Sequence, residues 1–402
     1  MKYIRNIALV LIMALAIGVM TSCTTYNNFK AAFFGVQGVK AETIKIGVLE
    51  PQTGVDSRMG NEEIRGIQLA HKLVLNVLNQ DIELIYADTQ SSIYAAETAV
   101  NDLVSKTPVV VLGSYGDTVS LIASQILGEA KIPAITITAT NPLITTNNPY
   151  YFRVTFTDAS QGKALAHYVV EKLGLKKAAI IRMKADDTTN DLLSKFRGRM
   201  RRLTENQNCI LTTVDVEDGV NDYTDYLQQI QDSGAKAVFM PVNLTAAEKV
   251  FAKAEEMGMQ DVHFIGPKAW HGDDLLTLAK KYPNIQISVA SDMVSHAEED
   301  VASDAQTTKM YDKFVELYKQ EFKGAEPTEA AALAFDAYMV AVNAIEKAGE
   351  TDAEILKDTI MKETKYNGVS GKIEFDSVGE PKKPINVDII QDGMYVSVFT
   401  VK

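Results

Sequence analysis

The chain is poor in cysteine, histidine and tryptophan, on which many disulfide, metal and cofactor sites depend. Its 402 residues include two cysteines, Cys23 and Cys209, one tryptophan and five histidines. A disulfide-rich scaffold is therefore excluded, and no two histidines have the i, i+4 spacing of a helical zinc site. GxGxxG, Walker and GxSxG motifs are also missing. These absences argue against dinucleotide, nucleoside-triphosphate, zinc and serine-hydrolase chemistry, so we expect no enzymatic activity, no cofactor and no metal.

The chain also has fewer positively charged residues than negatively charged ones. Lys and Arg number 40 against 52 Asp and Glu, which gives a formal net charge of −12. Such an acidic chain is repelled by phosphate backbones, so nucleic acid is excluded as a partner. The roughly 360 residues after position 42 are more than one hydrophobic core usually serves, and we expect two domains.

Long apolar runs are lacking except at the N-terminus. Lys2 and Arg5 precede an uncharged apolar run over residues 7–20. This run is short for a membrane span, which needs ~20 apolar residues, but has the length and flanks of a secretory signal. The N-terminus therefore predicts an extracytoplasmic location.

A cysteine follows this run at once. Met20-Thr21-Ser22-Cys23 resembles the lipobox, in which the cysteine is acylated and becomes the new N-terminus. This resemblance implies a signal peptide over residues 1–22, a lipid anchor at Cys23 and a tether over residues 23–42. Cleavage after Ala41 is the alternative, but that site lies far from the apolar run. If Cys23 is acylated, Cys209 has no disulfide partner, and we expect it to be an apolar residue of a strand.

From residue 43 onwards, short branched apolar runs alternate with segments of helical periodicity. We expect strands over residues 44–49, 82–88, 108–112, 133–137, 177–182, 210–216, 237–241 and 263–266. We expect helices over 64–78, 94–106, 118–130, 192–206, 223–233, 246–257, 307–324 and 329–347. This alternation predicts an α/β fold with two doubly wound parallel sheets. Strands over 371–375 and 385–401, the latter folded into a hairpin at Asp392-Gly393, end the chain.

Ligands of doubly wound sheets lie beyond the carboxyl ends of the strands. The loops that follow the predicted strands are therefore the candidate contacts: 49–60, 113–118, 138–141, 183–189, 242–244 and 266–271. Two lobes that face each other across such loops form a cleft that can close around a small molecule.

Several motifs resemble those of one family. Ile44 to Gly54 (IKIGVLEPQTG) is similar to the opening strand and loop of the branched-chain amino-acid binding proteins, which deliver solutes to ABC permeases. Ile132-Pro133-Ala134-Ile135 followed by Ala139-Thr140-Asn141-Pro142, Tyr151-Phe152-Arg153, and Gly368 to Asp376 (GVSGKIEFD) resemble later motifs of that family, in the same order. The resemblance implies a type I periplasmic-binding fold whose chain crosses three times between the lobes. It places residues 43–157 and 290–368 in a first lobe, and 158–289 and 369–402 in a second.

The resemblance also implies a pocket, and the pocket departs from the family. Thr138, Ala139 and Thr140 match the loop that holds an amino-acid ligand. Asp117 stands where the family has a serine near the ligand carboxylate, and Lys268 stands where it has an acidic residue near the ammonium. Asp187 and Asn243 replace common tyrosines, and Met59 lies in the first loop. Tyr115 is either an apolar wall of the pocket or a surface residue. Trp270 is either an apolar wall of the pocket or a residue packed under its loop.

Two like charges ~4 Å apart repel by roughly 4 kcal/mol at an effective dielectric constant near 20. A zwitterion in the family's usual orientation would meet this repulsion at both ends. Three interpretations stay open. The zwitterion binds the other way round, with its ammonium at Asp117 and its carboxylate at Lys268. Alternatively, the solute is not an α-amino acid but, for example, an organic acid held by Lys268 or an amide. In the third interpretation, Asp117 pairs with Lys268 across the cleft on closure and leaves a neutral or apolar solute between them. Delivery of the solute to an ABC permease and sensing for a signalling partner are both compatible with this pocket.

Overall fold

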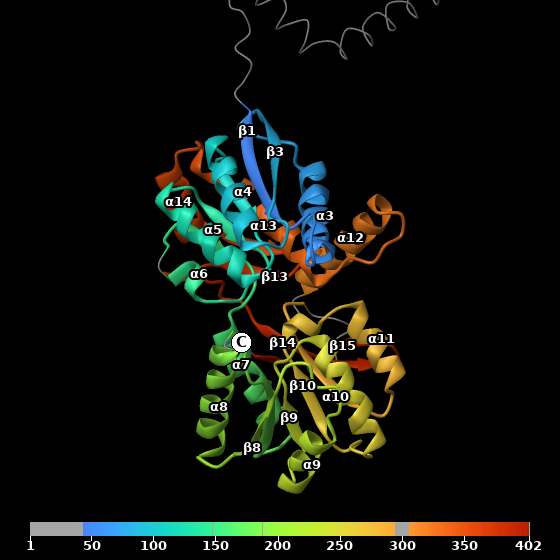
Figure 1. Cartoon of the computed structure of the whole chain (residues 1–402). Helices are drawn as coiled ribbons and strands as arrows, with labels where there is room; N and C mark the ends of the chain where they lie inside the picture. The colour runs from blue at the N-terminus through green and yellow to red at the C-terminus, as the bar shows by residue number, and fades with distance from the viewer. Residues whose placement is uncertain (1–42, 147, 187, 294–304, 402) are drawn as a thin grey trace, which may run out of the picture.

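The computed structural model describes residues 43–146, 148–186, 188–293 and 305–401, which form two α/β lobes stacked end to end (Figure 1). The first lobe is built on a sheet of order β2-β3-β1-β4-β5-β6, parallel except for β2. Its strands are β1 (Ile44–Glu50), β2 (Asn76–Val77), β3 (Gln80–Asp88), β4 (Val110–Gly113), β5 (Ala134–Thr136) and β6 (Tyr151–Arg153). The second lobe has the order β15-β14-β11-β10-β9-β7-β8, in which β14 runs antiparallel to both of its neighbours, β11 and β15. These strands are β7 (Ala178–Met183), β8 (Ile210–Val216), β9 (Ala237–Phe239), β10 (His263–Gly266), β11 (Gln286–Ser291), β14 (Ile385–Gln391) and β15 (Met394–Val401). The predicted fold class is confirmed.

Helices cover the first sheet. They are α3 (Ser57–Leu73), α4 (Ile93–Ser105), α5 (Asp117–Glu129), α6 (Leu143–Thr146), α12 (Ala305–Glu321), α13 (Glu329–Ala348) and α14 (Ala353–Glu363). The Ala-rich α13 is buried on almost every side, and it packs closely on α3 because Gly66 leaves room for its backbone. A Cβ added at Gly66 would lie 2.0 Å from the carbonyl oxygen of Ala331. This packing fixes the amino end of α13 at the edge of the sheet that faces the second lobe.

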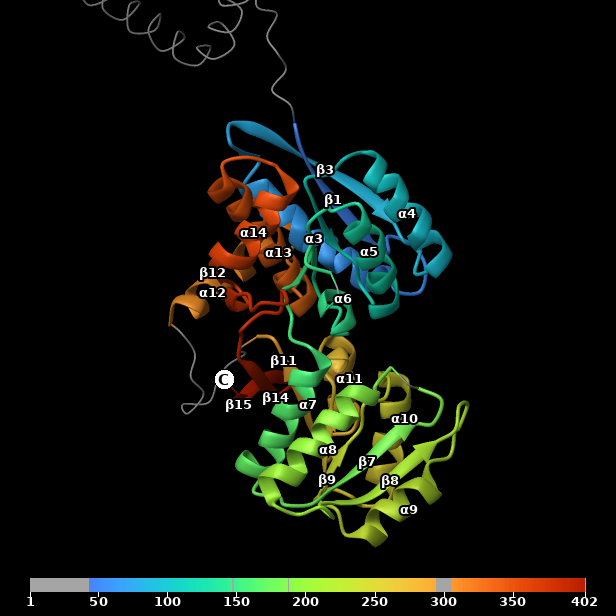
Figure 2. The same cartoon turned by 90° about the vertical axis from the view of Figure 1, so that its left-hand side faces the viewer.

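The second lobe has its own core and helices. They are α7 (Asp158–His167), extended by a π-helical turn over Tyr168–Lys172, then α8 (Asn190–Thr204), α9 (Thr224–Ser233), α10 (Leu244–Glu256) and α11 (Asp273–Lys281). Gly162 allows α7 to pack on α8, since a Cβ there would lie 2.4 Å from the carbonyl oxygen of Leu192. Cys209 is buried in this core. Figure 2 shows α7 and α8 side by side on one face of the sheet.

The chain passes between the sheets after β6, after β11 and after the hairpin of β12 (Lys365–Gly368) and β13 (Gly371–Glu374). The last passage comes later than the expected boundary at residue 369. Val369, Ile373 and Phe375 are buried in the core of the first lobe, and the Phe375 ring lies 5.3 Å from that of Phe152. Residues 369–375 therefore pack with the first lobe.

The helix predicted over residues 64–78 ends at Leu73. Leu78 and Asn79 adopt a left-handed turn that pairs β2 with β3, which the apolar spacing of Val74, Val77 and Leu78 did not indicate. Among the described residues, no helix combines the length and the apolar character that a membrane span requires.

Candidate ligand-binding cleft

A cavity of about 320 Å³ lies between the lobes, at the carboxyl ends of the strands. Its walls come from both lobes and from the starts of α7 and α13. They are formed by Met59, Tyr115, Gly116, Asp117, Thr138, Ala139, Thr140, Asp158, Gln161, Asp186, Thr188, Thr189, Leu192, Pro241, Val242, Asn243, Pro267, Lys268, Ala269, His271, Glu329 and Ala330. Two other hollows, of about 380 and 500 Å³, are lined by first-lobe residues alone. The inter-lobe cavity is therefore the candidate site.

The structure brings most of the predicted site residues together in this cavity. Its walls include Met59, Tyr115, Asp117, Thr138, Ala139, Thr140, Asn243 and Lys268. Asp187 lies outside the described residues. Asp186 and His271 belong to the predicted contact loops 183–189 and 266–271. Asp158, Gln161 and Glu329, which reach the cavity from α7 and α13, were not among the predicted contacts.

Trp270 does not line the cavity. It is 1% exposed, its ring meets Phe251 edge-on at 5.7 Å, and its Nε1–H donates to the carbonyl oxygen of Val242 at 2.6 Å. In the structure, Trp270 is thus packed under its loop and is not an apolar wall of the pocket. Trp270 anchors the loop that carries Lys268 and His271.

Asp117 is the first residue of α5, and it reaches across to the loop of Thr140. Its Oδ1 accepts hydrogen bonds from the backbone N–H groups of Thr140, at 2.7 Å, and Asn141, at 3.0 Å. The buried Arg153 supports the other side of the loop by donating to the carbonyl oxygens of Ala139 and Asn141. The backbone amides of the loop that the resemblance assigns to an amino-acid ligand are thus occupied by a carboxylate of the protein itself.

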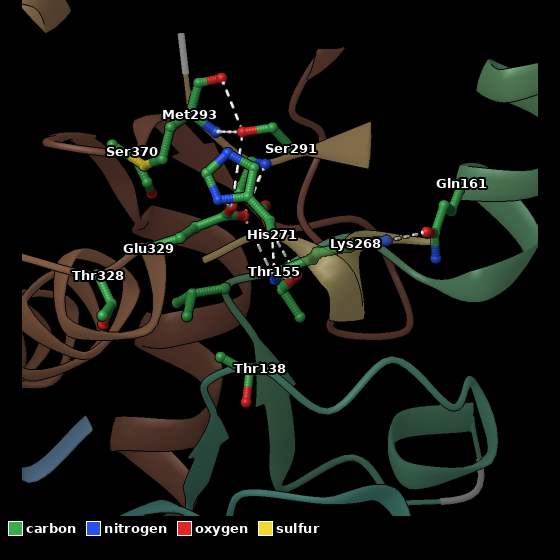
Figure 3. A network of polar contacts seen from close by, with 12 residues as sticks. Thr138, Thr155, Gln161, Lys268, His271, Ser291, Met293, Thr328, Glu329 and Ser370 are labelled. Atoms are coloured by element: carbon green, nitrogen blue, oxygen red, sulfur yellow. Dashed lines mark hydrogen bonds and ion pairs between the residues drawn. The ribbon is translucent and has the colours of Figure 1, made fainter. Parts of the chain in front are cut away.

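Lys268 points to the hinge. Its backbone N–H donates to Gln161 Oε1 at 2.7 Å, and its Nζ lies 2.5 Å from both Asp292 Oδ2 and Thr155 Oγ1 (Figure 3). Asp292 also pairs with the buried Lys383 at 2.8 Å. Burial alone would raise the pKa of Asp292, but the charges of Lys268 and Lys383 outweigh it and hold the pKa well below its ordinary value. In the part of the chain that the structure describes, Lys268 therefore pairs with Asp292 and not with Asp117.

His271 and Glu329 extend this arrangement across the lobes. Glu329 Oε1 accepts the backbone N–H of Asp292 at 2.7 Å and lies 3.7 Å from Lys268 Nζ. His271 lies 3.5 Å from Glu329 Oε2 and 3.2 Å from Asp388 Oδ2. Burial lowers the pKa of His271, but the two carboxylates outweigh it and raise the pKa above its ordinary value. We call Thr155, Lys268, His271, Asp292, Glu329, Lys383 and Asp388 the hinge network.

A pair of acidic residues lies behind the part of the cavity wall that the first lobe forms. Glu50 and Glu63 are fully buried; Glu50 accepts the backbone N–H of Tyr115 at 2.8 Å, and Glu63 accepts the hydroxyl of Thr138. Burial raises the pKa of Glu63 to about 7, and burial together with the neighbouring Glu63 raises that of Glu50. These carboxyls hold two residues of the cavity wall in place.

Asp158 begins α7, next to the same loop. Its backbone N–H donates to the carbonyl oxygen of Thr140 at 3.2 Å, so Asp117 and Asp158 both contact this residue. Burial, and then the negative charge of Asp117, raise the pKa of Asp158 to about 7. Within the described ranges, no cluster of three or more His, Cys, Asp or Glu side chains has an arrangement that could hold a metal ion.

Comparison with known proteins agrees with this geometry. The family model described as periplasmic binding protein matches residues 43–387. Leu/Ile/Val-binding protein homolog 1 of Brucella abortus is 22% identical over 364 residues, which cover 88% of this chain and 92% of that protein. An amino acid binding protein of Pseudomonas aeruginosa is 27% identical over 59% of this chain and 63% of its own length.

Solved structures show the same fold. A leucine binding protein of Thermotoga maritima superposes with a TM-score of 0.77 and 26% identity, over 90% of this chain and 99% of that one. A branched-chain amino acid binding protein of Streptococcus pneumoniae, in complex with isoleucine, has a TM-score of 0.75 and 24% identity, over 88% and 98% of the two chains. A solute binding protein of Rhodopseudomonas palustris, in complex with 3,4-dihydroxybenzoic acid, has a TM-score of 0.72 and 23% identity, over 90% and 97%. With these folds and a family model that spans most of its length, the chain belongs to the periplasmic binding proteins, the substrate-binding components of ABC transporters, which are not enzymes.

Proposed function

We propose that the protein is an extracytoplasmic lipoprotein that captures a small polar solute, such as an amino acid or a related compound, and delivers it to an ABC permease. The observation that carries this proposal is the inter-lobe cavity. Its volume of about 320 Å³ suits a small metabolite, and its walls combine apolar side chains with many polar and charged ones from both lobes.

Contacts between the lobes support binding by closure. Glu329, at the start of α13 in the first lobe, meets Lys268 and His271 of the second lobe inside the cleft. Arg58 and Asp274 meet at 2.7 Å on the outside. Such contacts would form as two lobes swing together about the chain segments that join them.

The chemistry of the walls departs from the pocket that the family resemblance implies. Asp117 and Asn243 make the cavity more polar than a pocket for an aliphatic side chain requires. We therefore infer a polar solute rather than leucine, isoleucine or valine.

The position of the first strand supports anchoring at Cys23. The carboxyl end of β1 faces the cleft, so its amino end at Ile44 lies on the opposite side of the first lobe. A lipid-linked tether that enters there would leave the cleft free for the solute and the permease. The wild-type protein should incorporate a labelled fatty acid during growth and a Cys23→Ala variant should not, and equal labelling of the two would contradict the anchor.

Solute binding is tested on the mature protein after unfolding and refolding, which removes any ligand acquired during expression. Before that step, native mass spectrometry of the protein as purified would identify a ligand that co-purifies. Thermal-shift screening of the refolded protein would cover the twenty amino acids, organic acids, amides and polyamines. A solute at 100 times its dissociation constant stabilises the folded state by ~2.7 kcal/mol, which raises the melting temperature by a few degrees. An Ala269→Trp variant, which fills the cavity, should abolish this shift, whereas Ala95→Trp, in a hollow of the first lobe alone, should leave it unchanged.

A further inference from the structure

The charges that line the cleft are unequal in number. Its acidic side chains are Asp117, Asp158, Asp186 and Glu329, and its basic ones are Lys268 and His271. An excess of carboxylates in a partly enclosed cavity attracts cations, because the field is concentrated between low-dielectric walls. The charge of the ligand that can bind therefore depends on which of these side chains are already neutralised by other residues of the protein.

Both basic side chains are engaged in the hinge network. Lys268 Nζ lies between Asp292, Thr155 and Glu329, and only 10% of its side chain is exposed. His271 lies between Glu329 and Asp388 and stacks on Tyr395 at 3.8 Å. A solute carboxylate would have to displace the protein's own carboxylates to reach either cation.

The amides that could hold a solute carboxylate are engaged too. The N–H groups of Thr140 and Asn141 donate to Asp117 Oδ1. Both of these hydrogen bonds are to one oxygen of Asp117, its second oxygen accepts none from a described residue, and the residue lines the cavity. An anion at this loop would meet Asp117 directly.

We propose that the solute is an organic amine, bound as its ammonium ion between Asp117 and Asp158, with no carboxylate recognised by the protein. This inference rests on the proposed function and names the chemical class of the solute. Asp117, from α5 of the first lobe, and Asp158, at the start of α7, both contact Thr140, and Asp186 adds a third carboxylate from the second lobe. A diamine would place its second ammonium toward Asp186.

Protonation gives this proposal a second signature. The pKa of Asp158 is raised to about 7 by burial and by Asp117, while Thr140 and Arg153 oppose the rise and Asp191 adds to it. A bound ammonium ion favours the ionised carboxylate and lowers this pKa. Near pH 7, amine binding should therefore release up to about half a proton per solute.

The test uses matched solutes that differ by one charged group. Leucine is compared with 3-methylbutylamine, which lacks its carboxylate, and with 4-methylpentanoate, which lacks its ammonium. Lysine is compared with pentane-1,5-diamine and with 6-aminohexanoate. Isothermal titration calorimetry should show the amine or the diamine binding at least about tenfold more tightly than its acid and its amino acid, given the repulsion between like charges at this range. Tighter binding of the acid or of the amino acid would overturn the proposal.

Variants locate the ammonium. Asp117→Asn and Asp158→Asn should each weaken amine binding at least about tenfold, and Asp158→Asn should also abolish the proton release measured in buffers of different ionisation enthalpy. Asp117→Ser frees the Thr140 and Asn141 amides, so it should favour leucine over its amine. Asp232→Asn, at the end of α9 and away from the cavity walls, removes the same charge and should change nothing.

The outcomes separate the two proposals. A bound acid or amino acid, displaced by the Ala269→Trp change, would uphold solute binding and overturn only the amine. Unchanged amine affinity in both Asp117→Asn and Asp158→Asn would also overturn it. No binding by any solute, together with no co-purifying ligand, would overturn both proposals.

Discussion

The two charged walls of the cleft differ in how their charges are balanced. On the hinge side, Lys268, Lys383 and His271 alternate with Asp292, Glu329 and Asp388 at distances between 2.5 and 3.7 Å. On the side of the Thr140 loop, Asp117 and Asp158 both contact Thr140, and neither forms an ion pair with a described residue. Asp117 accepts two backbone amides, whereas the side chains of Thr140 and Gln161 and the charge of Arg153 favour the ionised form of Asp158. The comparison teaches that a charge in a cleft points to a ligand only if the protein has not already neutralised it.

The largest expected effect concerns the hinge side, at Asp292. An Asp292→Ala change leaves Lys268 and the fully buried Lys383 without their shared carboxylate. Uncompensated buried charge costs about 3–5 kcal/mol, so the free energy of unfolding should fall by that amount in urea titrations. The matched control is Asp274→Ala, whose partner Arg58 is 64% exposed, and which should cost less than about 1 kcal/mol. Equal losses in the two variants would show that the hinge network does not differ from a surface pair.

A second test, with a smaller expected effect, compares one substitution on each of the two walls. Lys268→Met leaves Asp292 with Lys383 and Thr155, and we expect a loss of about 2 kcal/mol in the free energy of unfolding. Asp117→Asn keeps an acceptor for the Thr140 and Asn141 amides and should cost less than about 1 kcal/mol. Amine affinity should respond in the opposite order, falling more in Asp117→Asn than in Lys268→Met. If the variant that loses more stability also loses more affinity for the amine, the division of the cleft into a structural wall and a binding wall is wrong.

The fold was largely predictable from the sequence, because strand and helix periodicities are local properties. The alternation of apolar runs gave both parallel sheets, and the loops after the strands supplied most of the cavity walls. The helix predicted through Leu78 failed at a turn of positive φ, a conformation that apolar spacing does not report. Residues 369–375 were misplaced because their packing on the first lobe depends on a long-range contact with Phe152.

The partners of the charged site residues were not predictable. Lys268 and Asp292 are separated by a helix and a strand, and Lys383 comes from the last passage between the lobes. The sequence indicates that Asp117 and Lys268 are unusual at their positions, but not that one faces backbone amides and the other a buried carboxylate. Trp270 was open for a similar reason, since a ring in a loop after a strand can turn either into the cleft or into the core.

The last effect is gradual: it is a pH dependence on the binding wall, at Glu63. Its pKa is raised to about 7 in the folded protein from an ordinary value of 4.5, because burial disfavours the ionised form. The folded state therefore binds more protons than the unfolded state between these values, and the free energy of unfolding should decrease as the pH rises from about 4.5 to about 7, by at most ~1.4 kcal/mol per pH unit. Glu63→Gln should flatten this dependence, whereas Glu97→Gln, on the exposed face of α4, should not. Glu63 accepts the hydroxyl of Thr138, so its replacement also tests the cavity wall. If Glu63→Gln removes the slope without changing the affinity for the amine, the acidic pair supports the fold alone. A weaker affinity for the amine would instead show that the binding wall includes the carboxyls behind it.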